Sequence, residues 1–361
     1  MTKRILIVKF WALGDILMAT PILRALKNAY PDSHICWLVD QAYAGALEGN
    51  EYLDVVLPFD SGTWRRDYRY GRWRQYLATS ISLNRRLRAM NFDIVISLTA
   101  EKWWVVWFLC AVKKVGLFPF EKAGLLGRLY NYAVTRSPLG SRHNTDHYLE
   151  VLPALGIRGD FDRRMTYSPT RQRCDDVDYF LARQQEYDPL KPLLVMHPGT
   201  SQPSKCWPVS SYAQLANLLT SRFTVVITGS SEEASLANHI KAASINGGKL
   251  IVAAGVLTEL GHTGSLVDRA TAVVTGDTSV LHMASALNTP FAAIYGSSRP
   301  GDNAPLFGTY DLLYDDTVPC APCNQFTCPL KGDDHLRCQT VITPDTVFSS
   351  VMKLVETGKQ Q

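Results

Sequence analysis

Three short motifs in the 361-residue chain combine acidic, basic and hydroxyl side chains next to glycine. They are Leu13-Gly14-Asp15, His197-Pro198-Gly199-Thr200-Ser201 with Lys205 soon after it, and Gly276-Asp277-Thr278-Ser279 with His282. A carboxylate can take a proton from a reacting hydroxyl, while a lysine, hydroxyls and free backbone N–H groups can hold phosphate oxygens. The motifs together indicate group transfer from a phosphate-linked donor.

Asp15 has two possible roles on the evidence of its position. The preceding glycine permits a tight turn, and an acid at the start of a helix interacts favourably with the helix dipole and can cap free N–H groups. Asp15 is therefore either an N-cap or a catalytic base. Only the second role requires the carboxylate to face a substrate.

The other two motifs also have purely structural interpretations. Lys205 can be an ordinary lysine in a surface turn, and Asp277 or Thr278 can be an N-cap with His282 in the core. All three motifs, however, follow a predicted strand, and α/β sheets bind ligands at the carboxyl ends of their strands. Taken together, the motifs favour a binding site.

Alternating apolar runs and helical patterns position these motifs. The first half has predicted strands at residues 5–8, 35–39, 55–57 and 94–98, and a predicted helix at 16–29. The second half has predicted strands at 193–196, 224–228, 250–252, 272–275 and 291–295, separated by helices at 209–221, 232–243, 257–270 and 279–287. This rhythm predicts two α/β domains with doubly wound parallel sheets, at residues 1–175 and 190–345.

The composition is that of an ordinary folded protein. The chain is 46% hydrophobic and 19% charged, and its formal charge of +4 is too small to indicate nucleic-acid binding. The longest apolar run, residues 103–112, is about half of what a bilayer-spanning helix needs. Because residues 5–8 resemble a first strand and not an export signal, we expect a cytoplasmic protein.

The motifs resemble those of glycosyltransferase family 9, the heptosyltransferases of lipopolysaccharide core assembly. The resemblance rests on Leu13-Gly14-Asp15 with Ala19-Thr20-Pro21, the His197-Pro198-Gly199 strand end, Lys205 with Trp207-Pro208, and Gly276-Asp277-Thr278 with His282 and Ala284. It implies a GT-B fold, with two Rossmann-like domains facing across a cleft. It also implies an inverting transfer that needs no catalytic metal, most simply of heptose from ADP-heptose.

The resemblance also implies roles for individual residues. Asp15 is similar to the general base, and Lys205 to the group that meets the phosphate or the donor sugar. Thr200 and Ser201 would flank the diphosphate, Asp277 would hold donor-sugar hydroxyls, and Thr278, Ser279 and His282 would bind the diphosphate at the helix end. An acid on the nucleotide ribose matches either Glu232 or Glu233.

Eight cysteines fall into two groups. Cys320, Cys323, Cys328 and Cys338 have spacings acceptable for a structural four-thiolate zinc or iron site, and the alternative is a loop of unbound thiols. The other four are expected to be buried thiols: Cys36, Cys110, Cys174 and Cys206.

Residues 64–76 interleave five arginines with aromatic side chains. This pattern suits anionic sugars, phosphates and a membrane surface. With the apolar residues 103–108 nearby in sequence, it predicts that Arg65, Arg66 and Arg69 receive an anionic, lipid-linked glycan. Together with the resemblance to family 9, this pattern predicts peripheral contact with the inner face of the bacterial inner membrane.

Two other functions share some of these features. A sugar-nucleotide epimerase can have the same architecture but needs acid and base partners on both faces of one sugar. A non-enzymatic nucleotide-binding or metal-binding regulator would be built around residues 320–338.

Overall fold

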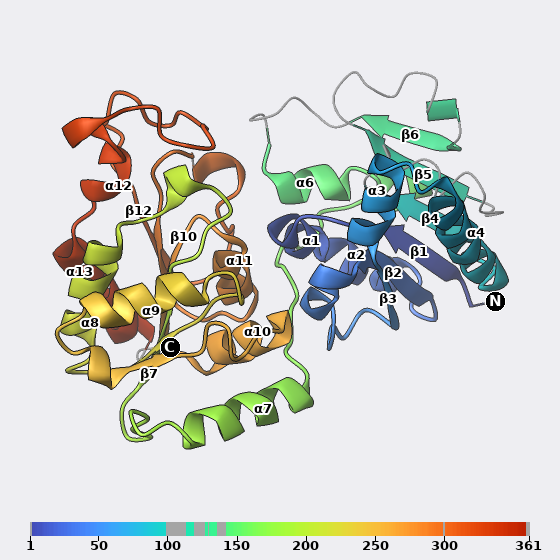
Figure 1. Ribbon diagram of the computed structural model, residues 1–361. Helices are drawn as coiled ribbons and strands as arrows, with labels where there is room; N and C mark the ends of the chain where they lie inside the picture. The colour runs from blue at the N-terminus through green and yellow to red at the C-terminus, as the bar shows by residue number, and fades with distance from the viewer. Residues whose placement is uncertain are drawn as a thin grey trace. The chain divides into compact units, whose positions relative to one another are not determined.

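A computed structural model describes residues 2–98, 113–118, 127–128, 130–135, 142–298 and 300–358 of the chain. The polypeptide divides into two compact units, Met1–Thr166 and Tyr167–Gln361 (Figure 1). The predicted first domain, residues 1–175, extends past this division and into α7 (Arg171–Ala182), whose Val177 and Leu181 pack in the core of the second unit. The apolar run at residues 103–112, with Cys110 in it, lies outside the described residues.

The first unit is built on a parallel six-stranded sheet in the order β3-β2-β1-β4-β5-β6. Both halves of the sheet start from the centre, so the topological switch point lies between β1 and β4. The strands read as continuous apolar runs because helices cover both faces of a doubly wound sheet. They are β1 (Arg4–Val8), β2 (His34–Asp40), β3 (Val55–Phe59), β4 (Ile94–Ser97), β5 (Lys113–Phe118) and β6 (Tyr132–Thr135).

The single helix predicted after the first strand is wrong in one respect, because the structure has two helices there. α1 (Leu13–Ala19) ends at Thr20, and α2 (Pro21–Ala29) begins at once. Pro21 has no N–H to continue the hydrogen-bond ladder and is suited to the first position of a new helix. The Thr20 hydroxyl donates to the Leu17 carbonyl at 2.7 Å and fixes the junction.

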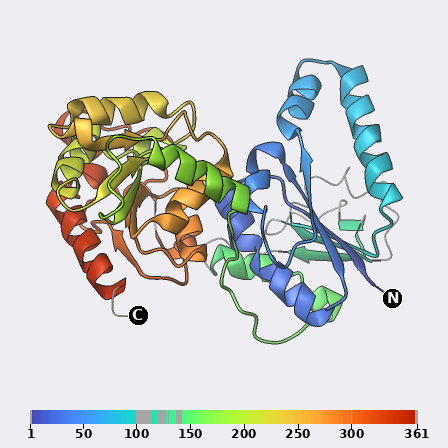
Figure 2. The same cartoon turned by 90° about the horizontal axis from the view of Figure 1, so that it is seen from below.

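The basic, aromatic stretch forms two helices that the apolar pattern did not predict. α3 (Ser61–Arg69) and α4 (Trp73–Ala89) form a helical hairpin that stands out from the sheet of this unit (Figure 2). Only Leu83, Asn84 and Leu87 of α4 are buried, so most of its surface carries charged or polar side chains. Such a narrow apolar stripe gives a weak helical signal in sequence. The last helix of this unit is α6 (Asn144–Leu149).

The second unit repeats the sheet topology of the first. Its parallel strands have the order β12-β11-β10-β7-β8-β9, so the switch point lies between β7 and β10. The predicted strands are confirmed to within two residues at each end, and β12 was not predicted. The strands are β7 (Leu193–His197), β8 (Thr224–Ile227), β9 (Leu250–Val252), β10 (Ala272–Gly276), β11 (Phe291–Ile294) and β12 (Tyr310–Leu313).

Helices enclose this second sheet in two apolar layers. One layer packs α8, α9 and α13 against the sheet, and the other packs α7, α10 and α11 against it. Because α13 belongs to the core, the unit continues well past the predicted end at residue 345. The helices are α7 (Arg171–Ala182), α8 (Val209–Leu219), α9 (Ala234–Ala243), α10 (Leu260–Arg269), α11 (Ser279–Ala286), α12 (Arg337–Thr340) and α13 (Pro344–Gly358).

Candidate active site

The turn after β1 places Asp15 beside a lysine that the sequence reasoning missed. Lys9 directly follows the strand, and its ammonium donates to Asp15 Oδ2 at 3.1 Å. The Lys9 side chain is only 7% exposed, whereas that of Asp15 is 36% exposed. Lys9 Nζ also lies 5.4 Å from the ring centroid of Tyr148 in α6. A buried cation therefore supports a carboxylate whose other side is open to solvent.

The capping interpretation of Asp15 is wrong. The N-cap of α1 is Ala12, which makes no side-chain cap, and Asp15 lies within the first helical turn. The carboxylate still benefits from the positive end of the helix dipole. It is thus free of a capping role and available for chemistry.

A polar chain lies next to this turn in the same unit. Trp11 Nε1 donates to Ser61 Oγ at 3.0 Å, and the Ser61 hydroxyl donates to Asp40 at the end of β2. The guanidinium of Arg65 stacks over the Trp11 ring, 4.6 Å from its centroid. These contacts bring the start of α3 to the carboxyl ends of β1 and β2.

The three arginines predicted to receive the acceptor line one cavity. Arg65, Arg66 and Arg69 surround about 340 Å³ together with Gly62 and Tyr70. Arginine presents several donors in a planar fork that matches carboxylate and phosphate groups. The cavity therefore suits an anionic ligand, and the stacking of Arg65 on Trp11 connects it to the turn that carries Asp15.

In the second unit, Lys205 and Asp277 lie together at the switch point. The Lys205 ammonium donates to Asp277 Oδ2 at 2.5 Å, and the Ser298 hydroxyl donates to the same oxygen at 2.5 Å. The two charged side chains are 17% and 11% exposed. Lys205 is therefore not an ordinary surface lysine, and Ser298 is a neighbour that the sequence reasoning missed.

The amino terminus of α11 lies directly after Asp277. Thr278 is the N-cap: its hydroxyl accepts from the Val280 N–H at 3.3 Å and pairs with Thr275 Oγ1 at 2.9 Å. Ser279 opens the helix, and His282, one turn later, is 4% exposed. The first turn of a helix offers N–H groups to an anion, so the lysine and this terminus form a ready phosphate site.

The structure distinguishes the two candidate ribose acids. Glu232 is exposed, whereas Glu233 lies against the turn after β7, and its carboxylate accepts from the Ser230 N–H at 2.7 Å. A Cβ built at Gly199 would meet the Glu233 carboxylate, so this carboxylate lies directly against the loop and would have to move for any other residue there. Glu233 is thus the acid that reaches the loop of the second motif.

His197, the last residue of β7, also lies near Glu233. Nδ1 of its imidazole ring is buried. Burial lowers the pKa of His197 because it disfavours the charged imidazolium, and the negative charge of Glu233 opposes this effect only in part. We therefore expect a neutral imidazole at the end of this strand near pH 7.

Thr200 and Ser201 occupy the turn after β7 in different ways. The Thr200 hydroxyl donates to the Gln202 carbonyl at 2.8 Å and lies 2.9 Å from Cys206 Sγ. Ser201 is exposed. Ser201 is therefore open to a ligand, while Thr200 shapes the loop that leads to Lys205.

The cysteines differ from the expectation for the scattered group. Cys36 is buried as predicted, but Cys174 and Cys206 are only half-buried. Burial, followed by the charges of Cys320, Cys323 and Cys328, raises the pKa of Cys338 to about 11. The four clustered cysteines thus share one neighbourhood, yet within the described parts of the chain no three His, Cys, Asp or Glu side chains are arranged to hold a metal ion.

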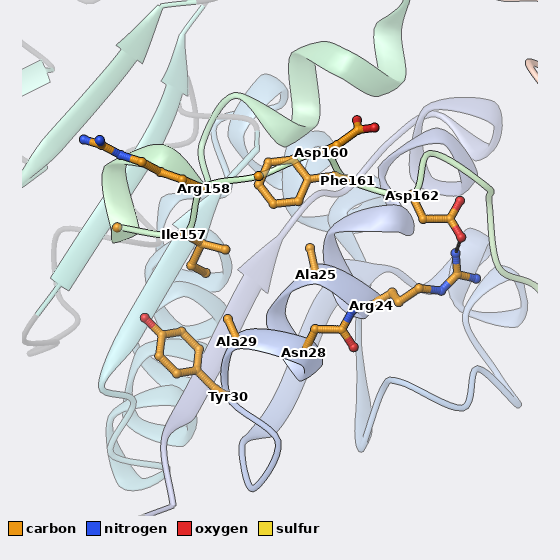
Figure 3. Close-up of a pocket in the computed structure, with 12 residues that line it drawn as sticks. Arg24, Ala25, Asn28, Ala29, Tyr30, Ile157, Arg158, Asp160, Phe161 and Asp162 are labelled. Carbon is orange, nitrogen blue, oxygen red and sulfur yellow. Dashed lines mark hydrogen bonds and ion pairs between the residues drawn. The ribbon is translucent and has the colours of Figure 1, made fainter.

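A further cavity of about 500 Å³ lies away from these motifs. It is lined by α2 and the segment that follows Leu155, and Figure 3 shows the ion pair of Arg24 with Asp162 at its side. Its lining includes Ala29, at the end of α2 opposite the switch point. None of the predicted site residues lines this cavity.

Comparison with known proteins decides the family. The sequence profile of glycosyltransferase family 9 (heptosyltransferase) matches residues 80–333. This chain belongs to glycosyltransferase family 9. The family 9 chain is 34% identical to lipopolysaccharide heptosyltransferase 2 of Escherichia coli strain K12 over 312 residues, which cover 84% of this chain and 85% of that protein.

Two further similarities agree with this assignment. Lipopolysaccharide heptosyltransferase 1 of Pseudomonas aeruginosa is 28% identical over 350 residues, covering 92% of this chain and 90% of the relative. The structure of the Escherichia coli heptosyltransferase WaaC with ADP superposes with a TM-score of 0.72 at 20% identity, covering 97% and 99% of the two chains. The chain is a glycosyltransferase with the GT-B fold, and the predicted fold class and enzyme class are confirmed.

No helix in the described ranges is long and apolar enough to cross a bilayer.

Proposed function

We propose that this glycosyltransferase moves heptose from ADP-heptose to a hydroxyl of a lipopolysaccharide core or a related cell-surface glycan, with inversion at the anomeric carbon. The main support is the pair of Lys205 and Asp277 at the amino terminus of α11, which provides a cation and a helix terminus for a diphosphate. The relatives named above are lipopolysaccharide heptosyltransferases, and WaaC has been solved with ADP. Family 9 transfer generally requires no cofactor.

The chemistry follows from two charges. Asp15 takes the proton of the acceptor hydroxyl as its oxygen attacks the anomeric carbon, and the bond from that carbon to the diphosphate breaks on the opposite face. Negative charge grows on the departing diphosphate, where Lys205 and the first turn of α11 stabilise it. Lys9 donates to Asp15 and keeps the carboxylate oriented.

The remaining groups bind and orient the donor. Asp277 accepts hydrogen bonds from hydroxyls of the donor sugar, while Thr278, Ser279 and His282 contact the diphosphate. Ser201 flanks the diphosphate and Thr200 holds the loop. We assign the ribose contact to Glu233 and not to Glu232, because the Glu233 carboxylate lies against the loop of the second motif whereas Glu232 is exposed.

We propose that the acceptor is an anionic, lipid-linked glycan received by the arginine cavity, and that the enzyme works at the cytoplasmic face of the bacterial inner membrane. The side chains of Trp73, Leu77 and Ile81 on α4 are each about half exposed, at 53%, 54% and 51%. Helical spacing puts Leu77 and Ile81 on the same flank as Arg74, Arg85 and Arg88. Exposed apolar groups flanked by arginines suit an anionic lipid surface.

This contact is tested with lipid vesicles and does not depend on transfer. The protein should float with vesicles that contain phosphatidylglycerol but not with neutral phosphatidylcholine vesicles. Replacing Leu77 and Ile81 by serine should abolish flotation, whereas Leu190→Ser, at a 93% exposed leucine of the second unit, should not. Equal flotation of all three proteins would remove α4 as the contact surface.

We further propose that any metal bound by this protein is held by Cys320, Cys323, Cys328 and Cys338 and is structural. Their shared neighbourhood supports this site, but the segment would have to tighten to bring the sulfurs to ligand distances. Elemental analysis of the purified protein, with Cys328→Ser as the comparison, tests it. A protein free of zinc and iron with unchanged stability would overturn this role.

The function itself is tested by a transfer assay. ADP-heptose and a heptose-deficient lipopolysaccharide should give a heptosylated product, and ADP should raise the melting temperature more than UDP or GDP does, because a ligand of the folded state stabilises it. Formation of an epimerised sugar nucleotide without acceptor would favour the epimerase. Binding of nucleotide without any turnover would favour a regulator.

A further inference from the structure

The cysteine-rich segment contacts the residue that precedes Lys205. Ser204 is 1% exposed, and its hydroxyl donates to the Gln325 carbonyl at 2.5 Å and lies 3.1 Å from Ser297 Oγ. The Ser204 N–H donates to the Phe326 carbonyl at 3.2 Å. The Gln339 side chain donates back to the Ser204 carbonyl at 3.5 Å. Every polar group of Ser204 is therefore engaged.

The same segment contacts the residue that precedes Ser298. The Asn324 N–H donates to the Ser297 carbonyl at 2.7 Å, and Ser297 is 1% exposed. A side chain at Gly296 would meet both the Gln339 amide and Cys338 Sγ. The chain after β11 is thus packed closely against the two ends of the cysteine-rich segment.

The residues that follow Ser204 and Ser297 share one hydrogen-bond acceptor, Asp277 Oδ2. Lys205 Nζ and Ser298 Oγ both donate to Asp277 Oδ2, and each belongs to the residue that follows a contact with the segment. We propose that Ser204 is a positioning residue, and that residues 320–339 act as a support that sets the placement of Lys205 and hence the affinity for the donor diphosphate. This inference rests on the proposed function, because it assigns Lys205 to that diphosphate.

Positioning differs from ordinary packing in what it predicts. A buried hydroxyl with two partners fixes the turn around Pro203–Lys205, and an ammonium displaced by about 1 Å loses much of a charge-assisted contact. The effect should therefore appear in donor binding and be absent from acceptor binding. It should also require that Lys205 be present.

The test measures binding of ADP and of inorganic pyrophosphate by titration calorimetry, together with steady-state kinetics, on the full chain. Ser204→Ala should weaken both ligands about tenfold, the size of one lost buried hydrogen bond, and raise the donor KM with little change in the acceptor KM. The matched control is Ser221→Ala, which also removes a serine hydroxyl bonded to a carbonyl in the same unit. The control should leave both affinities unchanged.

A double-mutant cycle with Lys205→Ala separates positioning from general loss of structure. If Ser204 acts through Lys205, adding Ser204→Ala to Lys205→Ala should cause no further loss of ADP affinity, because coupled residues are not additive. Additive losses would overturn the proposal, as would wild-type affinity in Ser204→Ala. If Ser204→Ala does not fold, Ser297→Ala provides the same cycle with a loss of a fewfold.

A failure of the proposed function would give a different result in these binding measurements. If Lys205→Ala alone leaves ADP and pyrophosphate affinity unchanged, the diphosphate assignment is wrong. If Lys205→Ala weakens binding but Ser204→Ala does not, only the positioning role is wrong.

Discussion

Each of the two units places a lysine and an aspartate together near its topological switch point, but only the first unit leaves one partner, the acid, substantially exposed to solvent. In the first unit Lys9 is 7% exposed and Asp15 36% exposed, so the acid is the accessible partner. In the second unit Lys205 is 17% exposed and Asp277 11% exposed, so neither is freely accessible and the lysine is the more open one. Two sheets with the same strand order thus carry lysine–aspartate pairs that differ in the exposure of the aspartate.

The difference follows from where the lysine enters the turn. Lys9 comes directly after β1, and its ammonium lies near the Tyr148 ring in a buried position. The Asp15 carboxylate is therefore the more exposed of the two groups. Lys205 comes eight residues after His197, beyond a loop and a short helical turn, and reaches Asp277 from the adjoining strand. The proposed base Asp15 and the proposed phosphate-binding Lys205 therefore follow the central strands of two sheets with the same strand order and differ in the loops that carry them.

The comparison predicts its largest effect at the exposed acid. Asp15→Asn keeps the shape of the side chain but cannot accept the proton, so turnover should fall by about 10² to 10⁴ while ADP affinity is retained. Asp32→Asn, at an exposed acid of the same unit, is the control. Near wild-type turnover of Asp15→Asn at saturating substrates would end the general-base role.

A smaller effect is expected at the cation of the second unit. Lys205→Ala removes a charge-assisted contact to phosphate, so ADP affinity should fall about 10- to 100-fold and the donor KM should rise. Calorimetry measures this, and Lys249→Ala, at an exposed lysine of the same unit, is the matched control. A loss in acceptor affinity instead would reverse the assignment of the two units.

The buried lysine should matter less than either of these. Lys9→Met removes the ammonium that holds the Asp15 carboxylate but keeps a side chain of similar length, and we expect turnover to fall about tenfold through misorientation. Lys9→Arg should recover part of the loss by restoring a cation. If Lys9→Met affected ADP affinity and left turnover unchanged, the two lysines would not differ as proposed.

The smallest effect concerns the strands themselves, because β7 ends in His197 whereas β1 ends in Val8. The pKa of His197 is lowered in the folded state, so below its ordinary value of 6.5 the unfolded chain binds a proton that the folded chain does not. The free energy of unfolding should therefore keep this contribution well above pH 6.5 and lose it progressively as the pH falls through 6.5. Urea unfolding of His197→Gln should lack this loss, whereas His239→Gln, at an exposed histidine, should retain it.

The sequence was sufficient to predict nine of the twelve described strands, all except β5, β6 and β12, and the residues with the clearest chemistry. Apolar runs predicted the strands, and glycine beside Asp15 and Asp277 indicated strand-to-helix turns. Lys9 was missed because a lysine directly after a strand normally reaches solvent. Tyr148, which lies beside the Lys9 ammonium, belongs to α6 and gives no signal near Lys9 in the sequence.

Other features required tertiary information. Glu232 and Glu233 are adjacent in sequence, and only the packing against Gly199 distinguishes them. Ser204 and Ser298 carry no local signal, because their partners lie about 120 residues and 21 residues away. The α3–α4 hairpin was missed because arginines outnumber apolar residues on its surface.

The cysteine-rich segment is held at both ends by the core. β12 pairs with β11 before it, and Val347 and Val351 of α13 are fully buried after it. The segment is therefore a closed loop, and each doubling of such a loop costs only about 0.6 kcal/mol of chain entropy. Evolution or an engineer can lengthen or exchange its outer part at little cost to stability, provided that the residues meeting Ser204 and Ser297 are kept. The segment can therefore accept inserted residues without a change in the sheet of the second unit.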